Sequence, residues 1–168
     1  MKFLLPLAVL ALLVACGSPD ERMKPDDIAE DTDIDGAWFS SDFEAEGPKI
    51  FVRRTDGVIE YFMTAERDGD TLYYSVGADM VLTGSAGLGD GRVGDTGPRI
   101  PLRIISADET CDPNCATRAT VQIDLTEAQF EAGQTEGLLV FFYGNKDVSF
   151  RVQREYVQGF AMALDAES

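Results

Sequence analysis

The chain has 168 residues and a strongly acidic composition, with 30 Asp and Glu against 14 Lys and Arg and a formal charge of −16. We expect no nucleic-acid partner, because the dense negative charge of a phosphate backbone would be repelled by such a surface. The sequence contains no histidine, which excludes Ser-His-Asp triads, Cys-His pairs, histidine zinc sites and histidine general bases.

Residues 1–15 have the pattern of a secretion signal. Lys2 precedes an apolar run over residues 3–14, which is shorter than the ~20 residues of a membrane-spanning helix. The run ends Leu13-Val14-Ala15-Cys16, which resembles the lipobox of bacterial lipoproteins, although a plain signal followed by a chance cysteine would look the same. The resemblance implies cleavage before Cys16 and membrane anchoring by lipid on its sulfur. Gly17, in place of aspartate, implies an outer-membrane lipoprotein facing the periplasm.

Residues 16–35 are expected to form a lipidated, disordered tether, followed by a single domain over residues 36–168. Beyond Cys16 the tether holds eight acidic residues and few large apolar ones. So little apolar surface cannot offset the entropy of ordering the chain, and the charge would keep it extended. Loss of Lys2 with the signal leaves 13 basic against 30 acidic residues, a charge of −17.

The domain is expected to consist mainly of strands. Residues 49–55 and 58–64 are rich in β-forming side chains, and Asp56-Gly57 between them predicts a type I′ hairpin turn. The continuous apolar run 138–143 is typical of a strand buried on both faces, and Gly144-Asn145-Lys146 after it predicts a second hairpin. Further strands are expected at 37–40, where Trp38 would anchor the core, and at 71–76, 79–83, 99–105, 119–125 and 147–153.

Two helices are expected. Thr126 and Gln129 have the spacing of a capping box, which predicts a short helix near 126–132 that ends at Gly133. Apolar residues at i, i+4 and i+8 (Tyr156, Phe160, Leu164) predict an amphipathic C-terminal helix near 155–164. The sequence thus predicts an all-β fold, mainly an antiparallel β-sandwich of roughly eight or nine short strands with two helices. Gly159 within the second helix suggests a close approach to a strand.

A glycine-rich segment over residues 84–97 separates the strands of the first half from those of the second. Gly89-Asp90-Gly91-Arg92-Val93-Gly94 matches G-x-G-x-x-G, but a dinucleotide site needs a strand before it and a helix opening within it. Asp90 and Asp95 lack the ordered ligand series of a calcium site. A flexible surface loop is therefore expected.

Of the three cysteines, Cys111 and Cys115 are the two that lipidation of Cys16 leaves free. In an oxidising compartment they are expected to form a disulfide. The alternatives are a redox pair, which would normally be spaced C-x-x-C, and a zinc site, which would need two further ligands. For a disulfide, the two Cα atoms should lie ~4.4–6.8 Å apart.

The C-terminal part resembles a known family. The ordered features are the pair Cys111 and Cys115, a β-rich segment, a short helix closing at Gly133, two strands, and a helix containing Gly159, Phe160, Ala163 and Leu164. This order, over residues 99–164, resembles the invasion-associated locus B family of secreted proteobacterial proteins. The resemblance implies a compact β-sandwich outside the cytoplasm and carries over no catalytic residue.

These observations predict a non-enzymatic, lipid-anchored envelope protein whose β-sandwich domain binds or supports another envelope or host component. Its expected partners are the membrane, through the lipid on Cys16, and a protein of unknown identity. An acidic binder or inhibitor of a basic protein or enzyme in the periplasm is the alternative. A hydrolase with paired carboxylates is a third hypothesis, but the spacing selects no pair. We expect no catalytic, cofactor-binding or metal-ligating residue.

Overall fold

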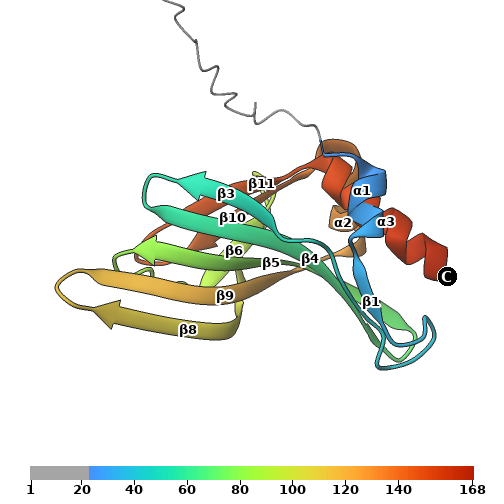
Figure 1. Cartoon of the computed structure of the whole chain (residues 1–168), viewed down its shortest axis with the longest axis horizontal. Helices are drawn as coiled ribbons and strands as arrows, with labels where there is room; N and C mark the ends of the chain where they lie inside the picture. The colour runs from blue at the N-terminus through green and yellow to red at the C-terminus, as the bar shows by residue number, and fades with distance from the viewer. Residues whose placement is uncertain (1–22) are drawn as a thin grey trace, which may run out of the picture.

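A computed structural model describes residues 23–168 (Figure 1). The expected signal at 1–15, Cys16 and the first part of the tether lie outside the described residues. Within residues 23–168 the strands form two antiparallel sheets, one of seven strands (sheet A) and one of four (sheet B). No helix in this part of the chain is long and apolar enough to cross a membrane. The predicted antiparallel β-sandwich is confirmed.

The two sheets differ in size and in the order of their strands. Sheet A runs in the order β1 (Asp33–Asp35), β2 (Glu44–Glu46), β4 (Gly57–Asp68), β5 (Thr71–Thr83), β9 (Cys115–Leu125) and β8 (Arg103–Cys111), and β3 (Ile50–Arg54) also pairs with β4. Sheet B runs in the order β11 (Val148–Val152), β10 (Leu138–Tyr143), β6 (Asp90–Val93) and β7 (Ile100–Pro101). β2 and β3 lie one after the other along the same edge of β4.

The core lies between the sheets and follows from the alternation of side chains along each strand. In β5, four apolar residues at alternate positions are at most 2% exposed: Val76, Ala78, Met80 and Leu82. From the facing elements, Phe142 and Phe150 of sheet B enter the same cluster, and the Phe150 ring stacks on that of Tyr61 at 5.5 Å.

Three helices gather at one end of the sandwich: α1 (Pro25–Glu30), α2 (Glu127–Glu136) and α3 (Arg154–Glu167), within residues 23–168 (Figure 1). The predicted capping box of α2 is confirmed, since the Thr126 hydroxyl accepts from the Gln129 amide and the Gln129 side chain accepts from the Thr126 amide. The predicted end at Gly133 is wrong, because Gly133 is buried within the helix and the cap is Gly137, whose amide donates to the Gly133 carbonyl. The predicted C-terminal helix is also confirmed. It buries Tyr156, Phe160 and Leu164 against the core.

The expected disordered tether is wrong for its second half. Residues 25–30 form α1, which packs on α3, and residues 33–35 form β1. The buried residue of α1 is Ile28, which is 4% exposed and lies against Gly159 of α3. A Cβ at Gly159 would come within 2.3 Å of the Pro25 carbonyl oxygen, so this glycine allows close approach to a helix and not, as expected, to a strand.

The first hairpin forms where it was predicted, but its turn differs. Arg54 pairs with Gly57, so Thr55 and Asp56 are the loop residues, and neither has the positive φ of a type I′ turn. Gly57 has φ of 152°, and a Cβ there would lie 2.0 Å from the Val81 carbonyl oxygen. The glycine therefore starts β4, where it passes close to β5.

Several other boundaries also differ. Residues 37–40 form a turn closed by a hydrogen bond from Ser40 N to Ala37 O, and Trp38 is only partly buried, with its ring 5.0 Å from that of Phe43. The expected strands 71–76 and 79–83 are one strand, β5, because Gly77 continues the ladder between them. The expected strand 99–105 is divided at Leu102, where the chain passes from sheet B to sheet A.

The glycine-rich segment is not a loop throughout, since residues 90–93 form β6 between β10 and β7. No helix follows this strand within the described residues up to 126, so the G-x-G-x-x-G match lacks the structure of a dinucleotide site. The apolar run of β10 is buried on one face only. On the other face, the Arg92 guanidinium covers the Phe141 ring at 4.6 Å.

Cys111 and Cys115 form the expected disulfide at the tip of the β8–β9 hairpin. Their Cα atoms are 3.9 Å apart, closer than the separation we expected. The two residues face each other directly across an antiparallel ladder, where backbone pairing already brings the strands close together.

Candidate functional site

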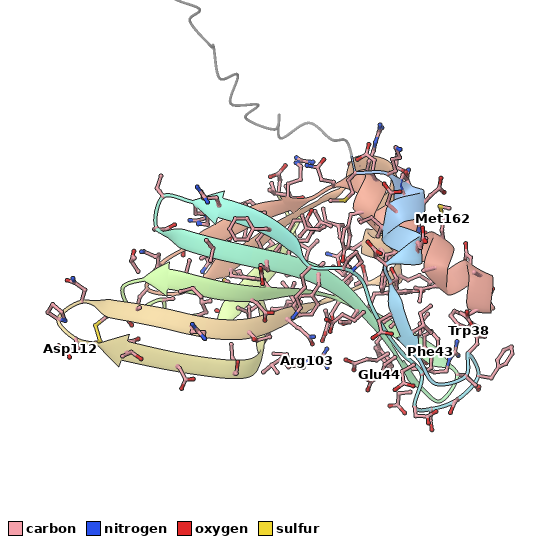
Figure 2. The ribbon with its side chains drawn as sticks, viewed as in Figure 1. Trp38, Phe43, Glu44, Arg103, Asp112 and Met162 are labelled. Atoms are coloured by element: carbon pink, nitrogen blue, oxygen red, sulfur yellow. A yellow bond between two sulfur atoms is a disulfide. The ribbon has the colours of Figure 1, made fainter. Side chains whose placement is uncertain are left out.

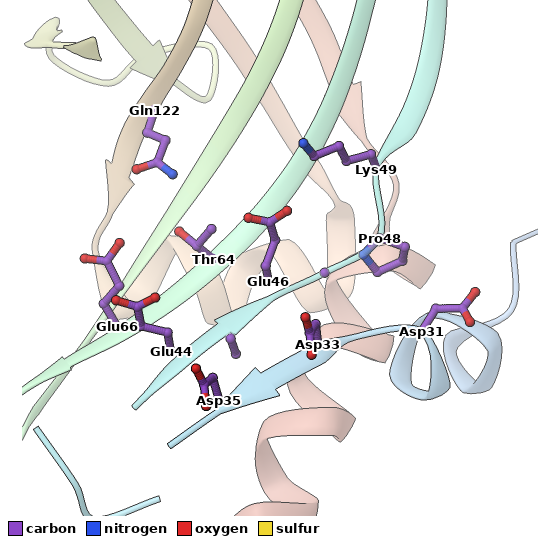
Figure 3. A pocket seen from close by; sticks show the side chains of 12 residues that line it. Asp31, Asp33, Asp35, Glu44, Glu46, Pro48, Lys49, Thr64, Glu66 and Gln122 are labelled. Carbon is purple, nitrogen blue, oxygen red and sulfur yellow. The ribbon is translucent and has the colours of Figure 1, made fainter. Parts of the chain in front are cut away.

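The outer face of sheet A, which points away from sheet B, carries a groove of about 650 Å³ at the junction of β1, β2 and β4 (Figure 3). We call it the acidic groove. Its lining residues are Asp31, Asp33, Asp35, Glu44, Ala45, Glu46, Gly47, Pro48, Lys49, Thr64, Glu66 and Gln122.

Strand register places the carboxylates of the groove directly opposite one another. Asp33 of β1 pairs with Glu46 of β2, and Asp35 pairs with Glu44. Glu44 in turn pairs with Glu66 of β4, which continues the acidic row into the sheet. The residues between them, Ile34 and Ala45, point the other way, and Ala45 is buried in the core.

Such an arrangement opposes folding, because like charges directly opposite each other on neighbouring strands are destabilising. Among residues 23–168, no lysine or arginine nitrogen lies within 4.0 Å of the carboxylates of Asp33, Asp35, Glu44 or Glu46. Glu66 does have a partner, the Arg103 guanidinium at 3.3 Å. The carboxylates of β1 and β2 therefore repel one another without an ion pair from the described chain, and Lys49 attracts Glu46 only at longer range.

The floor of the groove is polar, although its side chains are buried. The Thr64 and Ser75 hydroxyls are hydrogen-bonded to each other at 2.7 Å. Gln122 is 8% exposed, and its Oε1 has no hydrogen-bond partner among residues 23–168. Leaving a buried acceptor unpaired costs roughly 1–3 kcal/mol. Gln122 is thus an unsatisfied group at the inner end of an acidic cavity.

Lys49 is the basic residue that lines the groove, and it is already engaged. Its ammonium lies 2.8 Å from the Asp79 carboxylate and 5.1 Å from the centroid of the Phe62 ring. The hydrogen bond with Asp79 raises the pKa of Lys49. Although burial alone would raise the pKa of Asp79, hydrogen bonds from Lys49 and Thr120 outweigh it and hold that pKa below its usual value.

The C-terminal helix fixes the rim of the groove. The Tyr156 hydroxyl of α3 donates to the Pro48 carbonyl at 2.8 Å and accepts from the Met63 amide at 3.2 Å. Burial raises the pKa of Tyr156, so the hydroxyl keeps its proton for this bond at neutral pH. The segment between β2 and β3 is thereby held against the core.

The repulsion predicts that removing groove charge stabilises the fold. Glu44→Gln with Glu46→Gln should raise the unfolding free energy by about 0.2–1 kcal/mol for each like-charge pair relieved. The gain should shrink as salt screens the wild-type repulsion. Urea melts at low and high ionic strength measure both effects.

The matched control is Glu136→Gln with Asp147→Asn, which removes two exposed charges outside the groove. A groove variant less stable than this control at low salt would show that the carboxylates support the sheet, contrary to the prediction.

The cysteines predicted from the sequence do not lie at this groove. Asp112, beside the disulfide, and Glu44, in the groove, lie toward opposite ends of the molecule (Figure 2). Glu109 lies near both cysteines, but the sulfurs are bonded to each other and offer no thiolate to a metal.

Sequence reasoning missed the groove, because the acidic residues before position 36 were assigned to a tether. The sequence does contain a pattern that indicates the two acidic strands of the groove. Residues 33–35 and 44–46 both read acid, apolar, acid, which is the period of a strand with one buried face and one charged face.

Comparisons with known proteins give no match: no family model matches the chain, nor does any curated protein or any solved structure. The resemblance of residues 99–164 to the invasion-associated locus B family therefore stays a prediction.

Proposed function

We propose that this protein is a non-enzymatic, lipid-anchored envelope protein whose β-sandwich binds a basic segment of another envelope or host protein in the acidic groove. The observation that carries the proposal is the cross-strand pairing of Asp33 with Glu46 and of Asp35 with Glu44. Lysine or arginine side chains of a partner would convert this repulsion into attraction and would also speed association.

The concave shape of the acidic groove favours binding of an inserted basic segment over inhibition of a basic enzyme. An inhibitor that covers a basic enzyme would be served by a flat acidic face. Here the carboxylates line a hollow of about 650 Å³, a size that suits a few side chains of an inserted segment. The lipobox ending at Cys16 supports placing this groove at the outer membrane, facing the periplasm.

Binding accounts for the carboxylates better than catalysis does. Acid–base chemistry by a carboxyl pair needs two environments that differ enough to give the groups different roles. Asp33, Asp35, Glu44 and Glu46 are all exposed to solvent, so burial does not set one apart as an acid. The groove supplies negative charge to a ligand and does not separate an acid from a base.

Binding of a cationic probe tests the proposal. The full chain, purified in neutral detergent, should bind fluorescent hexalysine in an anisotropy titration, with affinity that falls as salt rises. Glu44→Gln with Glu46→Gln should weaken binding about tenfold at low salt, because two charges that contact the peptide are lost.

The control, Glu136→Gln with Asp147→Asn, has the same net charge as the groove variant and should bind nearly as wild type. Equal losses in the two variants would mean that hexalysine responds only to overall charge, and the proposed groove would be wrong.

A further inference from the structure

We propose that the inner end of the acidic groove receives one lysine or arginine side chain of the partner, whose N–H group donates to the Gln122 carbonyl. The inference rests on the proposed function and makes Gln122 the residue that recognises this side chain, while the carboxylates at the rim supply charge. It thereby adds a directional contact to an otherwise diffuse attraction.

The first argument is the state of Gln122. It projects from β9 into the groove and is more than nine-tenths buried, yet its Oε1 has no partner among residues 23–168. Figure 3 shows its side chain among those that line the groove. Oε1 is itself buried, but because no hydrogen bond holds it, rotation of the terminal amide can present the carbonyl to a donor in the groove.

The second argument is the negative charge near the unpaired Oε1 of Gln122. Glu46 pairs with Thr64 across β2 and β4, so its carboxylate stands beside the floor that Gln122 closes. A neutral donor would satisfy Oε1 but would leave this carboxylate without an ion pair, because Lys49 is paired with Asp79. A cation with N–H donors satisfies both groups at once.

The third argument is a precedent on the same face of sheet A. The Lys49 ammonium is held beside the groove by the Asp79 carboxylate at 2.8 Å, above the face of the Phe62 ring. The outer face of sheet A thus already accommodates one alkyl ammonium between an acid and a buried side chain. The Gln122 end offers the same combination without an occupant from the described chain.

A divalent metal ion fits the groove less well. Calcium requires six to eight oxygen ligands at about 2.3–2.6 Å, which must therefore converge. Among the described residues, no three acidic groups of the groove have ligand atoms within 4.8 Å of one another. The carboxylates are spread along the strands, an arrangement that suits the separate side chains of a basic segment.

Trimethylation of the lysine side chain separates the two contributions, because it keeps the positive charge and removes every N–H donor of the side chain. We compare hexalysine with hexa(trimethyllysine) in anisotropy titrations on the full chain in detergent. Wild type should bind the trimethylated peptide about tenfold more weakly, the usual effect of losing a hydrogen bond to a charged group. Gln122→Leu should bind the two peptides alike.

Glu44→Gln with Glu46→Gln serves as the matched variant. It should weaken binding of both peptides by a similar factor and keep the preference for unmodified lysine. Urea midpoints check the fold of Gln122→Leu, and the comparison of peptides on wild type needs no variant at all.

The outcomes separate the inference from the function on which it rests. Suppose that wild type binds both peptides equally and that the groove variant binds both more weakly. The groove then binds cations, but Gln122 does not recognise N–H donors, and this inference is overturned. A preference for unmodified lysine that survives Gln122→Leu overturns it as well. If neither peptide responds to the groove variant, the proposed function itself fails.

Discussion

Replacing Phe160 by alanine is expected to lower the free energy of unfolding by about 3–5 kcal/mol, the usual cost of removing a core phenylalanine. The side chain is fully buried and lies where α3 meets α2 and the segment after β2. Its ring lies edge-on to that of Phe130 at 6.4 Å, and it lies close to Gly47 at the rim of the groove. Since domains are stable by only about 5–15 kcal/mol, the loss would be a large fraction of the total.

Urea melts of the full chain in detergent measure this effect, with Met162→Ala as the control on the same helix. Met162 is 43% exposed, and its truncation should change stability by less than about 0.5 kcal/mol. Similar midpoints for the two variants would mean that α3 is a detachable helix and not part of the core.

The second large effect concerns the N-terminus. Cys16→Ser should abolish lipid attachment completely, because the thiol that the lipobox resemblance makes the acceptor is removed. Radiolabelled palmitate should then be absent from the variant, and the protein should stay uncleaved or leave the membrane fraction. A protein without acyl chains loses about 0.8 kcal/mol of membrane affinity for each buried CH₂.

Cys111→Ser with Cys115→Ser controls for loss of cysteines in general and should take up palmitate as wild type does. Palmitate incorporation into Cys16→Ser at the wild-type level would disprove the lipobox.

Local patterns in the sequence predicted the elements whose structure is decided locally. Thr126 and Gln129 cap α2 through contacts three residues apart, and the 144–146 turn joins β10 to β11. In each case the signal and the structure lie within about ten residues, so the chain nearby contains the information.

What could not be predicted depends on contacts between distant segments. Ile28 is buried because α3, some 130 residues later, leaves a space at Gly159. Nothing within the acidic stretch around Ile28 indicates that space. The groove has the same origin, since Glu44 meets Asp35 on one side and Glu66 on the other only through the register of three strands.

An apolar run in the sequence also does not show which side chains will pack on it in the fold. Phe141 and Tyr143 lie on the outer face of sheet B, where arginines cover them instead of a second layer of the core. The Arg99 guanidinium lies 3.7 Å from the centroid of the Tyr143 ring. Whether an aromatic side chain in a strand packs inward or beneath an arginine is decided by side chains elsewhere in the fold.

If Cys16 carries lipid as proposed, the docking of α1 on α3 limits how far the domain can stand from a bilayer. Nine residue steps separate Cys16 from Pro25, where α1 begins, and even a fully extended chain spans about 3.3–3.6 Å per residue. With lipid on Cys16, the start of α1 lies within about 30 Å of the membrane surface. The acidic groove begins at Asp31, just after this helix, whereas the disulfide-closed tip of β8 and β9 lies at the other end of the sandwich (Figure 1). Under the proposed anchoring and function, this short tether would favour a partner whose basic segment lies close to the headgroups over one that stays deep in the periplasm.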